Sequence, residues 1–178
     1  MKRFVPTIVA FVLFASLLLY TQFFEKKESP LQEVPVYSFN EKTIDEFSLS
    51  DGERKVVIKK DGIDWKLVEP EERAERAADP EQVQWFLRDF ASFKARAKLA
   101  DSVDSLEKYG LDHPSLIVTL KTEKGEVKEL RFGAKTPVGG NLYMKEGETL
   151  YTAPVYLLQI HQPDVLRFVK KIPESQPQ

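Results

Sequence analysis

The two histidines are the first residues to consider for chemistry, because an imidazole can ligate a metal or transfer a proton near neutral pH. His113 and His161 do not fall in a metal-ligand spacing such as H-x-x-x-H or H-E-x-x-H. His113 lies between Asp112 and Pro114 in an expected turn, whereas His161 ends an apolar segment. We therefore expect surface or internally satisfied histidines rather than a metal site or a catalytic base.

The other chemically suggestive patterns are also better explained by structure. Gly139-Gly140 follows Thr136-Pro137-Val138, but the P-loop spacing and its Lys-Ser/Thr ending are absent, which favours a wide hairpin turn. Glu71-Glu72 belongs to a highly charged segment, where nothing would raise the pKa of a carboxyl group. The chain has no Cys and no G-x-S-x-G elbow. We predict that the protein is not an enzyme and has neither cofactor nor metal.

Binding to a partner is the remaining kind of chemistry, and a few aromatic and basic side chains are its candidates. Trp85 falls on the polar side of a predicted helix with Arg88 and Arg96, where a large aromatic often marks a contact surface. An equal alternative is that a neighbouring segment folds over this tryptophan. Lys94, Arg96 and Lys98 form a modest basic cluster, for which a solvated face is favoured over binding of anionic lipid or polymer.

A helix positions these side chains, and its start is well marked in the sequence. Asp79-Pro80-Glu81-Gln82 provides an N-cap, Pro at the first helical position and Gln at the third. Apolar residues then recur at intervals of three and four, which predicts a helix to about Lys98 with one buried stripe. The stripe consists of Val83, Phe86, Leu87, Phe90, Phe93 and Ala97.

Three strands should precede this helix, at about 43–50, 54–60 and 63–69. Asp51-Gly52 and Asp61-Gly62 suit two-residue hairpin turns, which would pair Phe47 with Val56 and Ile58 with Trp65. The apolar side chains of all three strands then share one face of an antiparallel sheet.

The second half shows the same order of strands and helices. A three-residue loop at 123–125 would place Val118 opposite Leu130 and Leu116 opposite Phe132. A hairpin of 141–145 and 149–153 precedes a mostly helical end from Pro154 to about Lys171, and 172–178 should be disordered. We predict an α+β fold of two antiparallel β-meander-plus-helix sub-units, about 36–100 and 101–171, packed as one domain over 36–171.

The N-terminal segment, residues 1–24, is expected to be a transmembrane anchor. Residues 4–24 carry no charge, and a helix of this length covers the ~30 Å hydrocarbon core. A cleaved signal peptide is the alternative, but small residues with the spacing of a cleavage site are missing. The short N-terminal tail favours a cytoplasmic N-terminus, and residues 25–35 should form a linker to a periplasmic or external domain.

The formal net charge of −2 makes nucleic acid an unsuitable partner.

A further set of residues resembles a known family. Trp65-Lys66-Leu67 with Pro70, Tyr109-Gly110-Leu111-Asp112 with Pro114, and Phe132-Gly133 followed by Tyr143 and Tyr151 are similar to the bacterial domain-of-unknown-function family 4340, over about residues 40–170. That resemblance implies one N-terminal membrane helix and an association with ABC-type transport or gliding-type auxiliary components. It implies no catalytic residue.

These observations favour a non-enzymatic accessory or scaffolding subunit of a bacterial envelope complex, held in the inner membrane by a single helix. The first alternative is a periplasmic module that binds a glycan or lipid fragment between the two sub-units, using exposed aromatics such as Tyr143 and Tyr151. An envelope hydrolase is the weakest alternative, because convergent titratable groups are not evident in the sequence.

Overall fold

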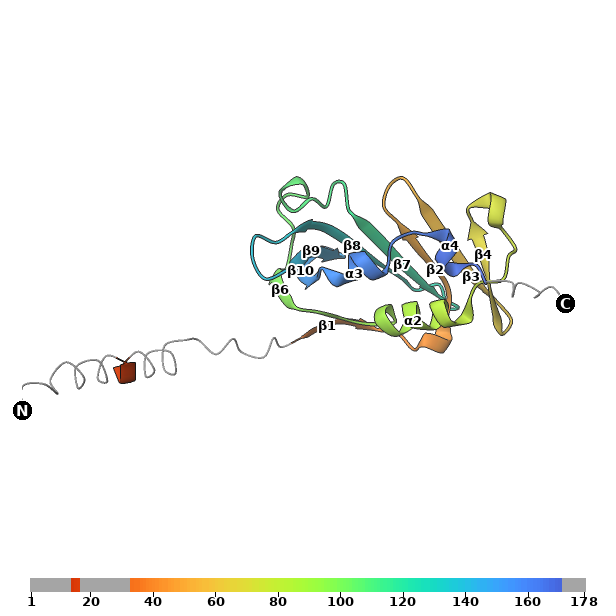
Figure 1. Ribbon diagram of the computed structural model, residues 1–178, viewed down its shortest axis with the longest axis horizontal. Coiled ribbons are helices and arrows are strands. Elements are labelled where there is room, and N and C mark those ends of the chain that lie inside the picture. Colours follow the sequence, from red (N-terminus) through yellow and green to blue (C-terminus); the bar gives the residue numbers. More distant parts are fainter. Residues whose placement is uncertain (1–13, 17–32, 171–178) are drawn as a thin grey trace, which may run out of the picture. The chain divides into compact units, whose positions relative to one another are not determined.

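The computed structural model describes residues 14–16 and 33–170, and the longer range carries an eight-stranded antiparallel sheet (Figure 1). The order of strands across the sheet is β4-β3-β2-β7-β8-β9-β10-β6. Its strands are β2 (Ile44–Ser50), β3 (Lys55–Asp61), β4 (Asp64–Glu69), β6 (Ala97–Ala100), β7 (Leu116–Thr122), β8 (Val127–Lys135), β9 (Asn141–Glu146) and β10 (Thr149–Pro154). A separate two-stranded sheet joins β1 (Val34–Ser38) to β5 (Ser92–Ala95).

The predicted anchor falls almost wholly outside the described residues. Residues 14–16 are helical, whereas the rest of 4–24, most of the linker and the 172–178 tail are not described. In the part of the chain that the structure describes, no helix is long and apolar enough to cross a membrane.

Helices pack on the apolar side of the sheet, which confirms an α+β fold. They are α2 (Pro80–Phe90), α3 (Tyr156–Ile160) and α4 (Val165–Phe168). Phe86 of α2 stacks on Phe47 of β2 with ring centroids 4.1 Å apart, and Phe168 of α4 lies 5.9 Å from the same Phe47 ring. All three rings are buried, so the central contact between helices and sheet is aromatic.

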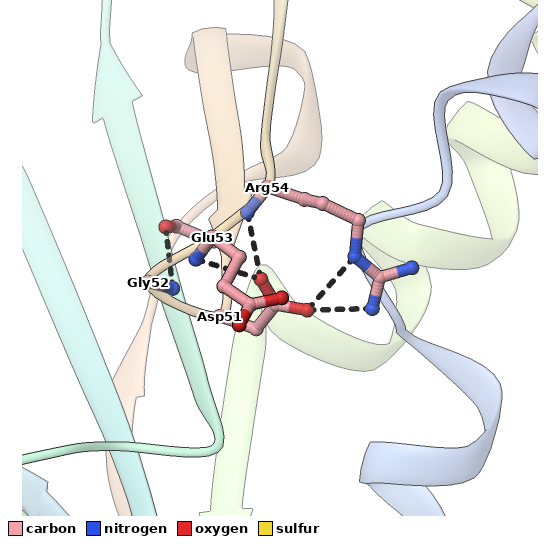
Figure 2. Close-up of polar contacts among 5 residues, drawn as sticks. Asp51, Gly52, Glu53 and Arg54 are labelled. Carbon is pink, nitrogen blue, oxygen red and sulfur yellow. Dashed lines mark hydrogen bonds and ion pairs between the residues drawn. The ribbon is translucent and has the colours of Figure 1, made fainter.

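The first two hairpins differ from the predicted register by two residues. Leu49, not Phe47, pairs with Val56, because the turn spans four residues, Asp51 to Arg54. Both oxygens of the Asp51 carboxylate accept hydrogen bonds from this loop, including those from the Arg54 side chain at 3.0 and 2.6 Å (Figure 2). A shift of two residues preserves which side chains share a face, so the predicted apolar face is correct although the partners are not.

The hairpin between β7 and β8 has the predicted register. Val118 pairs with Leu130 and Leu116 with Phe132, and Gly125 adopts a positive φ of 82° in the loop. Glycine tolerates this conformation without the strain that a Cβ would cause, which is why the loop fixes the register.

The helix that begins at Pro80 is shorter than predicted. Asp79 caps it, accepting a hydrogen bond from the Glu81 backbone N–H at 2.9 Å, but the helix ends at Phe90 rather than near Lys98. Residues 92–95 instead form β5, where Phe93 and Ala95 point inward, and pair with β1. Phe93 and Ala97 also fit the period of two that is typical of a strand. Pairing with the distant strand β1 therefore favours a strand over a helix in this segment.

Strands from both predicted sub-units belong to the same sheet. Phe47 of β2 pairs with Leu120 of β7, so the sheet runs without interruption from the first half into the second. At one end, residues 75–78 cover part of β4, and the Ala78 N–H donates to the Trp65 carbonyl at 2.7 Å. The other end of the sheet is β6.

A close backbone contact joins the two glycine-containing motifs of the family resemblance. A Cβ added to Gly133 in β8 would lie 2.3 Å from the Tyr109 carbonyl oxygen and 2.9 Å from that of Gly110. Gly110 itself has a φ of 64°, in the left-handed region that glycine adopts without strain. The two motifs are therefore parts of one packing unit that requires a residue without a side chain.

Candidate functional site

The outward side of α2 carries an exposed aromatic residue. The Trp85 side chain is 53% exposed, so no described segment folds over it. The guanidinium of Arg88, one turn further on, lies 4.9 Å from the centroid of its ring. This cation–π contact holds the indole against the helix surface and presents a flat, partly apolar face to solvent.

A polar groove begins next to this pair, at the C-terminal end of α2. It encloses about 200 Å³ between the end of α2, β5 and the start of α3, and its lining includes Arg88, Asp89, Lys94, Arg96 and Tyr156. Arg88 belongs to both features, because it contacts the Trp85 ring and lines the groove. We name Trp85 together with the residues of this groove the α2 surface.

Ion pairs in the groove are long and exposed. Glu33 lies 3.8 Å from the Lys94 ammonium and 3.9 Å from the Arg96 guanidinium, and all three side chains are at least one-third exposed. Such pairs contribute little to stability, because water screens them. Arg88 is likewise exposed and lies 3.9 Å from Asp89, so the three cations, Arg88, Lys94 and Arg96, are available to an acidic partner at small energetic cost.

A histidine–aspartate pair lies behind the groove. His161 is fully buried, and its Nε2–H donates to Asp89 Oδ2 at 2.8 Å. Burial lowers the pKa of His161, while the Asp89 carboxylate acts in the opposite direction. The neutral ring is T-shaped to Phe90 at 4.8 Å, so one side of this histidine is packed and the other is hydrogen-bonded.

The predicted site residues divide into two groups. Trp85, Arg88 and Arg96 come together at the α2 surface. Tyr143 and Tyr151 do not line its groove. Tyr151 is only 8% exposed, which corrects the expectation of an exposed aromatic, because its side chain belongs to the hydrophobic core. Tyr143 is half-buried against the ring of Tyr109, 4.9 Å away.

Some functional features could not be recognised in the sequence. The sequence predicts histidines that lie at the surface or have their hydrogen bonds satisfied. His113, which is 95% exposed, fits this prediction. His161 fits it only in part, because its Nδ1 has no hydrogen-bond partner in the described structure. Asp89 is 72 residues away from His161, and no spacing rule connects them. Within residues 14–16 and 33–170, no three acidic or histidine side chains are grouped as metal ligands.

Comparison with known proteins gives one match. A family model described as Domain of unknown function (DUF4340) matches residues 65–175, well over half of the chain. The match begins later than the resemblance at about residue 40, within β4. Neither the curated proteins nor the solved structures include a significant match.

Proposed function

The chain belongs to the DUF4340 family, and we propose that it is a non-enzymatic accessory or scaffolding subunit of a bacterial envelope membrane complex, such as one associated with ABC-type transport. The exposed Trp85 is the observation that supports this proposal most directly. A tryptophan on the polar side of a helix gains most when a partner buries it, and tryptophan and arginine are enriched among the residues that dominate binding energy.

The charges around Trp85 define the kind of partner. Arg88, Lys94 and Arg96 line one groove, and their acidic neighbours are already engaged, Glu33 by two of these cations and Asp89 by His161. We propose that the α2 surface binds an acidic segment of an envelope protein, with an apolar side chain of that segment against the indole.

Attachment to the membrane is part of the same proposal. The apolar residues 4–24 form the proposed single-pass anchor, with a cytoplasmic N-terminus and the folded unit in the periplasm or outside the cell. The linker of about ten residues would keep the α2 surface within reach of proteins in the same membrane.

Replacement of Trp85 tests the proposal. The full-length protein carrying Trp85→Ala should recover its membrane partner roughly tenfold less well than wild type after mild detergent extraction, because a buried tryptophan is typically a hot spot. Recovery is quantified by mass spectrometry of the co-purified proteins, and thermal unfolding establishes that the variant is folded.

Ile63→Ala is the matched control. Ile63 is 94% exposed in the turn between β3 and β4, so its removal takes away an exposed apolar side chain outside the α2 surface. Partner recovery should be unchanged in this variant. A protein that stays monomeric and alone at native expression, or a partner recovered equally with Trp85→Ala, contradicts the proposal.

A further inference from the structure

A second exposed apolar region borders the groove of the α2 surface, on helix α3. Tyr156, which lines the groove, is 47% exposed, and Ile160, one helical turn further on, is 39% exposed. Side chains four residues apart lie on the same side of a helix. The next residue of each turn, Leu157 and His161, is buried. Helix α3 therefore buries one side and presents Tyr156 and Ile160 together to solvent.

An aromatic side chain consequently lies on each side of the Arg88 guanidinium. Arg88 contacts the ring of Trp85 and lines the same groove as Tyr156. Lys94 of β5 and Arg96, which follows β5, complete the cationic lining. The surface thus offers apolar contact from both helices, with the positive charges between them and along β5.

The size of the groove limits what can enter it. A cavity of about 150 Å³ accommodates benzene, so the groove, at about 200 Å³, has room for one large side chain. Its three cations favour a carboxylate as the group that enters, because hydrogen bonds between ionised groups are the strongest kind. The backbone of a bound partner must then remain outside the groove.

A partner in that position finds no strand edge to pair with. β5 is hydrogen-bonded to β1 along one edge, and the N–H of Arg96 donates to the Thr152 carbonyl of β10 at 2.7 Å. An extended segment would therefore gain no backbone hydrogen bonds from this surface, although these bonds supply the affinity of strand addition. A helix satisfies its own backbone groups and can carry an apolar side with acidic residues along its flank.

We propose that the partner of the α2 surface is an acidic amphipathic helix. Its apolar side chains contact Trp85 on one side and the pair of Tyr156 and Ile160 on the other, and one of its carboxylates enters the groove beside Arg88. This inference rests on the proposed function, because it names the kind of segment that the same surface binds.

Three synthetic peptides of about 18 residues, or five helical turns, are the probes. The first is built from Leu, Ala, Glu and Gln, with Leu at the i, i+3, i+4 and i+7 positions and Glu along the flank. The second has one central Ala replaced by Pro, which breaks the helix and keeps the charge. The third has Lys in place of every Glu. Binding of the labelled peptides to the full-length protein in non-ionic detergent micelles is measured by fluorescence anisotropy, with empty micelles as the blank.

The helical acidic peptide should bind, the proline peptide should bind roughly tenfold more weakly, and the lysine peptide should not bind. Tyr156→Ala and Ile160→Ala should each weaken binding of the helical peptide roughly fivefold, because each removes apolar contact area. Leu106→Ala is the matched control, since Leu106 is also 39% exposed but does not line the groove. Thermal unfolding establishes that the three variants are folded.

Equal binding of the helical and proline peptides would identify an extended segment as the occupant and overturn the inference. Binding that is unchanged in both Tyr156→Ala and Ile160→Ala, or no binding of the helical peptide up to about 1 mM, overturns it as well. In each of these cases Trp85→Ala can still lower the recovery of the membrane partner. The proposed function itself fails only if that recovery is unchanged, so the two failures are distinguishable.

Discussion

At the scale of single residues, His161 joins several parts of the molecule. It packs against the rings of Phe86 and Phe90, donates to Asp89 on α2, and lines a cavity whose other wall comes from the first hairpin turn. Asp89 lies on the helix whose polar side carries Trp85. A change at this histidine can therefore affect the α2 surface through Asp89, which lines its groove.

Burial of His161 predicts a pH dependence of stability. Burial lowers the pKa of His161, the nearby Arg167 adds to this effect, and the Asp89 carboxylate opposes it. Above the ordinary pKa of 6.5 the ring is neutral in both states and the full stability is present. As pH falls from 6.5 through the lowered folded-state pKa, the unfolded chain binds the proton first, and stability is lost.

Urea unfolding measured between about pH 7.5 and pH 5, roughly the window of histidine titration, should show this loss for wild type. His161→Phe should remove most of this part of the slope. His113→Phe is the control, because the His113 ring is almost fully exposed, and it should leave the slope unchanged. Equal slopes in wild type and His161→Phe would show that another group is responsible.

Residue-level chemistry was the least predictable part from the sequence. The sequence marks Trp85 and Arg88 as neighbours on a helix face, because helical spacing is local. It does not reveal that His161 meets Asp89 or Asp51 lies near Ser115, since those contacts depend on how the sheet and α3 pack. Tyr151 was misassigned for the same reason: its place in the hydrophobic core depends on tertiary packing.

At the scale of elements, the cap of α2 and the loop between β7 and β8 were reliable local signals, whereas the Asp-Gly pairs of the first two hairpins did not give the register. Asp79 begins α2 as predicted, and the loop at Gly125 sets the register of β7 and β8. The end of α2 was not predictable, because β5 exists through its pairing with β1 more than 50 residues earlier in the sequence. Local propensity and periodicity favour one element type only weakly. A distant strand that satisfies the backbone hydrogen bonds outweighs them.

The contact between Gly133 and the turn at Gly110 predicts a large effect of a small substitution. Gly133→Ala should reduce the free energy of unfolding by about 3 kcal/mol, because the added methyl group would meet backbone atoms that cannot rotate away. Gly147→Ala is the comparison: Gly147 has a positive φ of 55° and open space around it, so only the left-handed backbone strain of about 1 kcal/mol applies.

Chemical denaturation of the two variants gives both values. A loss at Gly133 equal to or smaller than that at Gly147 would show that β8 moves away from the turn without penalty. The expected difference would instead explain why Tyr109-Gly110 and Phe132-Gly133 occur together in the family resemblance.

At the scale of the whole molecule, the chain separates by its contacts into 1–32 and 33–178. This division allows the anchor proposal to be tested without disturbing the fold. Deletion of residues 1–32 should release the protein from the membrane fraction and leave the cooperative unfolding of the remainder intact. Fractionation followed by thermal unfolding measures both.

Leu13→Lys is the more specific variant, because it places a charge near the middle of residues 4–24 at a cost of roughly 3 kcal/mol for insertion. It should shift the protein out of the carbonate-resistant membrane fraction. Membrane association that survives both changes would show that the folded unit itself holds the protein there.

The position of β6 has a consequence for the order in which the protein can be made. β6 (97–100) precedes β7 in the chain, yet its partner in the sheet is β10 (149–154), the last strand to be synthesised. The eight-stranded sheet therefore cannot be completed until nearly all of the chain is available. The pairing of strands far apart in sequence is also slow. During synthesis or export, β6 therefore remains unpaired. This strand is the point at which a chaperone that holds unfolded chains would be most useful.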